Sequence, residues 1–210
     1  MTIALAGLAA YCVLRSPVLG NVWINEALDA ALSVRNLADL CGDLCGLLAL
    51  CALVIHAANA WGKPELNGFI AHAGIAVAAF VTLAFVKAGG ASADISYIGH
   101  LGGWAEAYSY VAAVAILIAN VVIFGSVILA HESKDRVWLT VLLPLGAGSL
   151  CGIFVGAYRA TEYLHADMFA SSQDAVVWPL SALTTFLYAV AAHGNYRIKT
   201  TEPMPERERV

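Results

Sequence analysis

Charged residues are scarce in this sequence. Asp, Glu, Lys and Arg make up 12% of its 210 residues, about half the share found in a soluble domain. The few basic residues are scattered, and the sequence has neither the basic face nor a motif through which proteins bind nucleic acid. These absences argue against a soluble domain of any size and against nucleic acid as a partner.

Catalytic signatures are also missing. The sequence contains no GxSxG elbow, HExxH pair, P-loop or glycine-rich dinucleotide turn. The cysteines are odd in number and all lie in apolar runs, which argues against a disulfide framework and favours a role as small core residues. The sequence therefore favours a protein that is not an enzyme, without excluding catalysis, and predicts no resident cofactor. The cysteines are Cys12, Cys41, Cys45, Cys51 and Cys151.

What the sequence does contain is long apolar runs. Hydrophobic residues make up 60% of the chain, in runs close to the roughly 20 residues that cross a bilayer. We predict an all-α, polytopic transmembrane helical bundle over residues 1–196, followed by a disordered, charged cytoplasmic tail over 197–210. The predicted helices cover residues 2–14, 36–60, 67–86, 104–130, 137–164 and 175–196.

The first helix is short for a full crossing, so the prediction is six spans, or five if this helix does not cross. The segment from Gly20 to Val34 alternates apolar and charged residues and could lie in the membrane interface. With both termini in the cytoplasm, seven of the 11 Lys and Arg residues lie on the inner side. The positive-inside rule therefore favours this orientation in an inner (plasma) membrane.

Small residues form a ridge on the helix predicted over 137–164. Gly148, Gly152 and Gly156 recur at every fourth position, so another helix can approach the backbone closely on that side. The sequence leaves open whether the ridge packs inside one subunit, between two copies of the chain in a homodimer, or against a host membrane complex.

Ionisable residues inside the predicted spans are the main functional signal. Arg35, Asp39 and Asp43 are spaced by four and fall on one helix face. A carboxylate within the bilayer costs a few kcal/mol unless it is paired or faces water. We expect Arg35 to neutralise Asp39, and we predict that Asp43 or Asp39 pairs with Arg159 of the ridge helix.

Further acids gather at the same predicted membrane side. One hypothesis is an acidic, outward-facing cleft that attracts a cationic ligand. The other is a structural salt-bridge network that holds helix ends together. The acids are Glu106, Glu162, Asp167 and Asp174.

Two histidines and one amide complete the candidates. His56 and His72 are at similar depths on neighbouring predicted helices and are weak candidates for binding a metal or haem. Hydrogen bonding between helices is the simpler interpretation for both. Asn120 is the most deeply placed amide, and we expect it to hydrogen-bond to another helix.

Several segments carry a family resemblance. They are NLADL at the start of the helix predicted over 36–60, AEAYSYVAA at the start of the helix beginning at 104, and GAGSLCGIFVGAYRA in the ridge helix. Together with a short first helix ending at Arg15, they resemble the multi-pass membrane proteins of actinobacteria and their phages that carry a transporter label. The resemblance spans roughly residues 8 to 195. It implies a polytopic inner-membrane protein, and it brings no catalytic residues.

Three functions remain open at this point. The first is a membrane protein that binds or transports a small solute, cationic if the acids line its site. The second is a membrane interaction protein that does not transport, such as a phage exclusion or immunity factor. The third is a haem- or quinone-linked membrane protein.

Overall fold

The computed structural model describes residues 2–16, 18–93, 102–130, 137–164 and 173–201, without the side chains of residues 21, 162–164, 173, 174 and 201. This part of the chain is helical and contains no strand. Its elements are α1 (Thr2–Leu14), the π-helix η1 (Leu19–Ile24), α2 (Asn25–Leu32), α3 (Leu37–Ala60), α4 (Leu66–Lys87), α5 (Trp104–Leu129), the π-helix η3 (Trp138–Leu142), α7 (Leu143–Leu164) and α9 (Gln173–Thr201).

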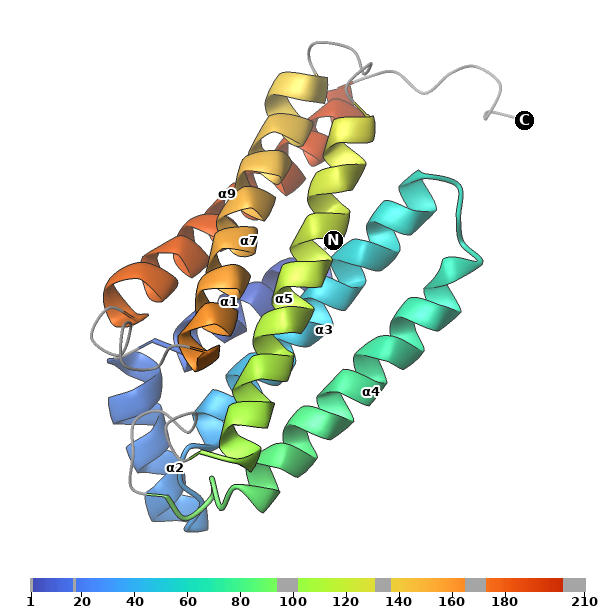
Figure 1. Ribbon diagram of the computed structural model, residues 1–210. Coiled ribbons are helices and arrows are strands. Elements are labelled where there is room, and N and C mark those ends of the chain that lie inside the picture. Colours follow the sequence, from blue (N-terminus) through green and yellow to red (C-terminus); the bar gives the residue numbers. More distant parts are fainter. Residues whose placement is uncertain (1, 17, 94–101, 131–136, 165–172, 202–210) are drawn as a thin grey trace.

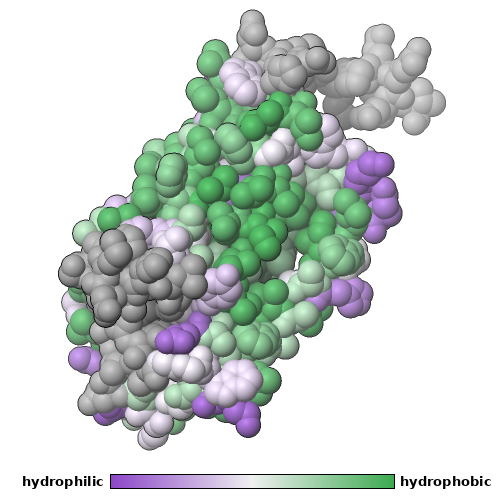
Figure 2. Space-filling view, viewed as in Figure 1, coloured by the Kyte–Doolittle hydropathy of each residue, from purple (hydrophilic) through white to green (hydrophobic). Residues whose placement is uncertain are grey.

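Five helices in the described ranges are long and apolar enough to cross a membrane: α3, α4, α5, the continuous η3 and α7, and α9. Large apolar side chains such as Phe69, Ile75 and Phe154 are more than half exposed, as expected where lipid replaces water. Hydrophobic residues cover most of the middle of the visible surface (Figure 2). The protein is therefore an integral membrane protein built as a helical bundle.

The predicted fold class is confirmed, with a few local differences. The predicted helix boundaries hold to within about two residues, except at the last helix. There α9 continues to Thr201, so the prediction of a disordered segment from residue 197 is wrong over 197–201. The short α1 is not among the five long apolar helices. The interfacial placement of residues 20–34, where η1 and α2 lie, stays a prediction.

The helices form a bundle with two ends (Figure 1). α3 runs antiparallel to α4, and α5 antiparallel to α7, while α4 lies at the outer edge against α3 and α5. The short α1 packs against α3 and α9, and α7 packs between α5 and α9. We name the ends of the bundle after the residues that mark them: the Arg15 end, where α1 finishes and α3 begins, and the Trp61 end, where α3 finishes.

The first turn of α3 is fixed by two asparagines. Asn25 of α2 accepts a hydrogen bond from the Ala38 backbone N–H at 2.9 Å, which satisfies one donor that the helix itself cannot use. Asn36 adopts a left-handed conformation with φ of 54°. Its side chain donates to the carbonyl oxygens of Gly90 and Ala93, each at 2.9 Å. These contacts set the position of the polar residues in the first turns of α3.

The glycines of α7 face two different helices. A methyl group at Gly156 would lie 2.8 Å from the Leu117 backbone nitrogen of α5, and one at Gly152 would overlap the Asn120 amide. A methyl group at Gly148 would instead lie 2.9 Å from the Tyr188 ring of α9. The small residues therefore allow α7 to lie close to both α5 and α9 within one chain.

Candidate functional site

Four side chains from three helices and that of Arg15, which follows α1, meet near the Arg15 end. We call these five residues the charged cluster: Arg15, Asp39, Asp43, Tyr108 and Arg159. Arg15 Nη1 lies 2.6 Å from Asp39 Oδ1, and Arg15 Nε lies 3.6 Å from Asp43 Oδ1. Arg159 Nη1 lies 3.8 Å from the same Asp43 oxygen. Tyr108 donates a hydrogen bond of 2.6 Å to Asp43 Oδ2. The predicted pairing of Asp43 with Arg159 is thus confirmed.

Three side chains of the charged cluster are almost completely buried. The side chains of Asp39 and Asp43 are 1% exposed, and that of Arg159 is 2% exposed. With both arginines and both aspartates ionised the cluster has no net charge, which offsets much of the cost of burying each ion. Asp39 Oδ2 and Asp43 Oδ1 still lack a hydrogen-bond donor among the described residues. The carboxylates therefore retain acceptor capacity that a small ligand or water could use.

Sequence reasoning missed two members of the charged cluster, Tyr108 and Arg15, and the position of Arg15 depends on α1. Arg15 follows α1, and its stem lies across the start of α3, where a methyl group at Gly42 would be 2.9 Å from Arg15 Cγ. One turn along α3, Gly46 makes the same room for the Tyr11 ring. The signal was in the sequence as a pair of glycines on the face that carries Asp39 and Asp43. Only the packing of α1 against that face shows what fills the space.

Two predicted members do not belong to the charged cluster. Arg35 Nε lies 3.2 Å from Asp29 Oδ2 of α2, with both side chains about two-fifths exposed, so the expected pairing of Arg35 with Asp39 is wrong. Asn36 in the left-handed conformation separates Arg35 from the regular helix. Glu106 is exposed and makes no hydrogen bond or ion pair with another described residue.

The side chains of three further predicted acids lie beyond the part of the chain that the structure describes. The side chains of Glu162 and Asp174, and the whole of Asp167, lie outside the described residues. The acids that the structure brings together at this end are Asp39 and Asp43, and both face arginine.

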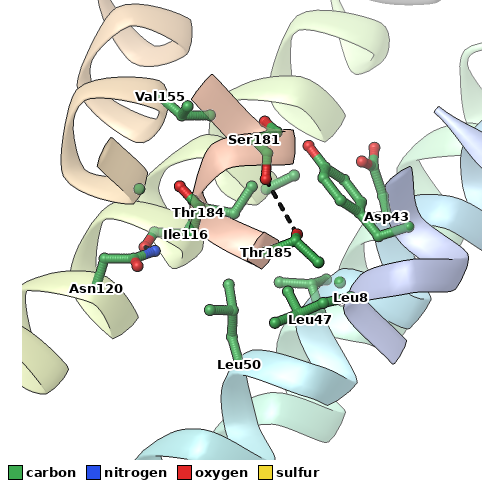
Figure 3. A pocket seen from close by; sticks show the side chains of 14 residues that line it. Leu8, Asp43, Leu47, Leu50, Ile116, Asn120, Val155, Ser181, Thr184 and Thr185 are labelled. Atoms are coloured by element: carbon green, nitrogen blue, oxygen red, sulfur yellow. Dashed lines mark hydrogen bonds between the residues drawn. The ribbon is translucent and has the colours of Figure 1, made fainter. Parts of the chain in front are cut away.

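A void of about 40 Å³ adjoins the charged cluster. In Figure 3, Asp43 and Asn120 lie on opposite sides of this void, and Ser181, Thr184 and Thr185 of α9 lie between them. A cavity needs roughly 10–15 Å³ to hold one water molecule, so the space is large enough for a few waters or one small ion, with Asp43 and Asn120 among its polar lining residues. Most of its wall is aliphatic, from side chains such as Leu47 and Leu50.

A second polar group closes the far side of the void. Tyr188 of α9 donates a hydrogen bond of 2.6 Å to Asn120 Oδ1, and its hydroxyl lies 3.0 Å from Ser149 Oγ of α7. All three residues are buried. The expectation that Asn120 bonds to another helix is therefore confirmed. This bond links α5 to α9, and the Tyr188–Ser149 contact links α9 to α7.

The weak metal candidates are not brought into one site. His56 lines a separate, larger cavity near the Trp61 end, whereas His72 Nδ1 lies 2.6 Å from the Gly68 carbonyl oxygen of its own helix. Among the residues that the structure describes, no three His, Cys, Asp or Glu side chains are grouped as metal ligands. The geometry gives the haem hypothesis no support.

Comparisons with protein-family models, with curated proteins and with solved structures find no match to this chain.

Proposed function

We propose that the protein binds a small cation at Asp43 and moves it through the interior of the bundle. The observation that carries the proposal is the burial of Asp39, Asp43 and Arg159 inside membrane-spanning helices, next to a void, with Arg15 as a further partner at the end of α1. Ionisable residues at such positions are expensive to keep and are characteristic of ion and substrate pathways. Among the described residues, Asp39 and Asp43 lie in a closed, charge-neutral cluster and not in the acidic, outward-facing cleft expected from the sequence, so the proposal requires this cluster to open.

Charge balance indicates how a cation would enter. The charged cluster is neutral, so an added cation leaves a net positive charge in a medium of low dielectric constant unless one arginine moves away. The contact between Arg15 and Asp39 is short, at 2.6 Å, whereas Arg159 and Asp43 are 3.8 Å apart. The looser pair is the one to exchange. A cation at Asp43 would replace Arg159, and loss of the cation would let Arg159 return.

The void supports a route from Asp43 toward the middle of the membrane. It is bounded at its far side by Asn120, which is hydrogen-bonded to Tyr188. Asn120 Nδ2 also donates to the Ile116 carbonyl oxygen at 2.8 Å, and the Tyr188 hydroxyl lies 3.0 Å from Ser149 Oγ, so these contacts must change together before the two side chains turn. The pair would form the inner barrier of the route. In this mechanism the charged cluster and the Asn120–Tyr188 pair open alternately, as expected of a carrier.

Orientation extends the proposal. The described charges at the Trp61 end are Lys63, Glu65, Arg197 and Lys199, an excess of basic residues that favours a cytoplasmic position. The charged cluster then lies toward the outside of an inner (plasma) membrane, with both termini inside if α1 crosses.

The test is cation flux in proteoliposomes. Purified protein is reconstituted in liposomes, a membrane potential is imposed, and entry of H⁺, Na⁺ and guanidinium is followed separately. We expect the wild type to conduct at least one of these probes and Asp43→Asn to lose that flux. Glu106→Gln is the matched control, because it removes an exposed acid near the same end of the bundle and should leave the flux unchanged.

Two results would overturn the proposal: no flux of any of the three probes with wild-type protein, or equal flux with wild type and Asp43→Asn. If the protein also purifies with a stoichiometric membrane partner, the second hypothesis, an interaction protein, takes its place. If the preparation contains a homodimer, a mixed dimer with one Asp43→Asn subunit locates the route. Half of the wild-type flux would place one route in each subunit, and loss of the flux would place the route between the subunits.

A further inference from the structure

A second cavity, of about 590 Å³, lies near the Trp61 end of the bundle. Residues of α3, α5, η3, α7 and α9 line it, including Leu53, Ala57, Val127 and Leu145. Its volume falls within the roughly 300–1,000 Å³ of ligand-binding pockets. α3 leans away from α5 toward this end of the bundle (Figure 1), so the space lies between two membrane-spanning helices.

The lining of this cavity is amphipathic along its length. The polar members are His56, Trp61, Ser126 and Asn195, and each lies within about two turns of the end of its helix at the Trp61 end. The Ser126 hydroxyl is already bonded to the Val122 carbonyl oxygen of its own helix at 2.8 Å. The deeper wall is aliphatic, so it favours hydrocarbon over water.

The charges beside the cavity are mainly positive. Arg197 and Lys199 of α9 are exposed, and Lys199 is close enough to His56 to act on it electrostatically. Lys63, which follows α3, has Glu65 at 3.7 Å as its partner, so the described charges at this end remain positive in sum. A ligand with an anionic head would pair with the basic residues at the Trp61 end, and a hydrocarbon chain would pack against the aliphatic wall.

We propose that this cavity binds an anionic phospholipid from the bilayer. One acyl chain fills the aliphatic part, and the phosphate lies at the Trp61 end near His56 and Lys199. Trp61 stands at the depth where indole rings prefer the headgroup layer. The inference does not depend on cation transport, because the cavity is separate from the void beside Asp43 and shares no lining residue with it.

The test is native mass spectrometry of protein released from nanodiscs that contain equal amounts of phosphatidylglycerol and phosphatidylcholine. We expect wild-type protein to retain one phosphatidylglycerol in preference to phosphatidylcholine. Ala57→Phe, which places a ring in the cavity, should lose this lipid, whereas Ala79→Phe on the exposed face of α4 should keep it.

A charge variant tests the headgroup contact without filling the cavity. Lys199→Gln should lower the preference for phosphatidylglycerol about fivefold, the effect of one basic residue near an anionic lipid. Lys87→Gln, at the opposite end of the bundle, should leave it unchanged. The proposal is overturned if no lipid is retained, if the two lipids are retained equally, or if Ala57→Phe folds and still carries the phosphatidylglycerol.

Discussion

The guanidinium of Arg15 lies 2.6 Å from the carboxylate of Asp39, across the contact between α1 and α3. The Asp39 side chain is 1% exposed, so the bond is made away from water. This pair fastens a helix too short to be counted among the long spans to the centre of the bundle. The contribution of this buried pair to the free energy of unfolding can be compared with that of the exposed Arg35–Asp29 pair.

We predict that Arg15→Gln destabilises the protein by about 3–5 kcal/mol, because it leaves a buried carboxylate without its main partner. Arg35→Gln is the control, since the Arg35–Asp29 pair is substantially exposed and such pairs contribute roughly 0–1 kcal/mol. The measurement is unfolding in mixed micelles. The double variant Arg15→Met with Asp39→Leu should recover stability relative to Arg15→Gln. The pairing would be contradicted if the stability loss of the double variant equalled the sum of the losses caused by Arg15→Met and Asp39→Leu alone.

We predict that Tyr108→Phe lowers stability by about 1.5–3 kcal/mol, the usual contribution of a hydrogen bond to a charged group. The change removes only the hydroxyl that donates to Asp43 and keeps the ring, whose centroid lies 6.2 Å from that of Phe85. Tyr110→Phe is the matched control, because Tyr110 is on the same helix and is 43% exposed. Equal effects of the two variants in the same unfolding assay would argue against a buried hydrogen bond at Asp43.

We predict opposite effects for two glycine-to-alanine changes. At Gly156 the added methyl group meets the backbone of Leu117 at 2.8–2.9 Å, so α5 and α7 must move apart, at a cost of about 1–3 kcal/mol. At Gly125 of α5 nothing lies within 4 Å, and alanine in a helix should be neutral or stabilise by roughly 0.5–1 kcal/mol. Thermal unfolding of the two variants in one detergent makes the comparison. If Gly156→Ala were as stable as Gly125→Ala, the close approach of α5 and α7 would be disproved.

We predict a measurable coupling between Asn120 and Tyr188. In a double-mutant cycle of Asn120→Ala and Tyr188→Phe, the coupling free energy should be about 0.6 kcal/mol, with an upper limit of roughly 1.7 kcal/mol, as for other hydrogen bonds between membrane helices. Ser126→Ala is the control, because its hydroxyl bonds within its own helix. In the flux assay Asn120→Ala should also raise leakage by weakening the inner barrier, and unchanged leakage would speak against that role.

Much of this fold was predictable because the bilayer restricts what the chain can do. Backbone groups in hydrocarbon must bond within the segment, so an apolar run of sufficient length becomes a helix whatever its neighbours are. That is why α3, α4, α5 and the continuous η3 and α7 begin and end close to the predicted residues. Because hydrocarbon offers no water to a carboxylate, Asp43 needed a counter-charge. Arg159 could be predicted as that counter-charge because few ionisable residues lie at the same depth.

The structure alone decided which residues complete the charged cluster. The guanidinium groups of Arg15 and Arg35 were equally available in the sequence. The packing of α1 across Gly42 brings Arg15 to Asp39, while the left-handed turn at Asn36 directs Arg35 to Asp29. The two cavities were hidden for the same reason, since each is lined by residues of at least four elements. The hydropathy and length of a helix are properties of one segment, so they can be predicted from the sequence. Ion-pair partners and cavities depend on distances between segments, which are set by the packing of the helices.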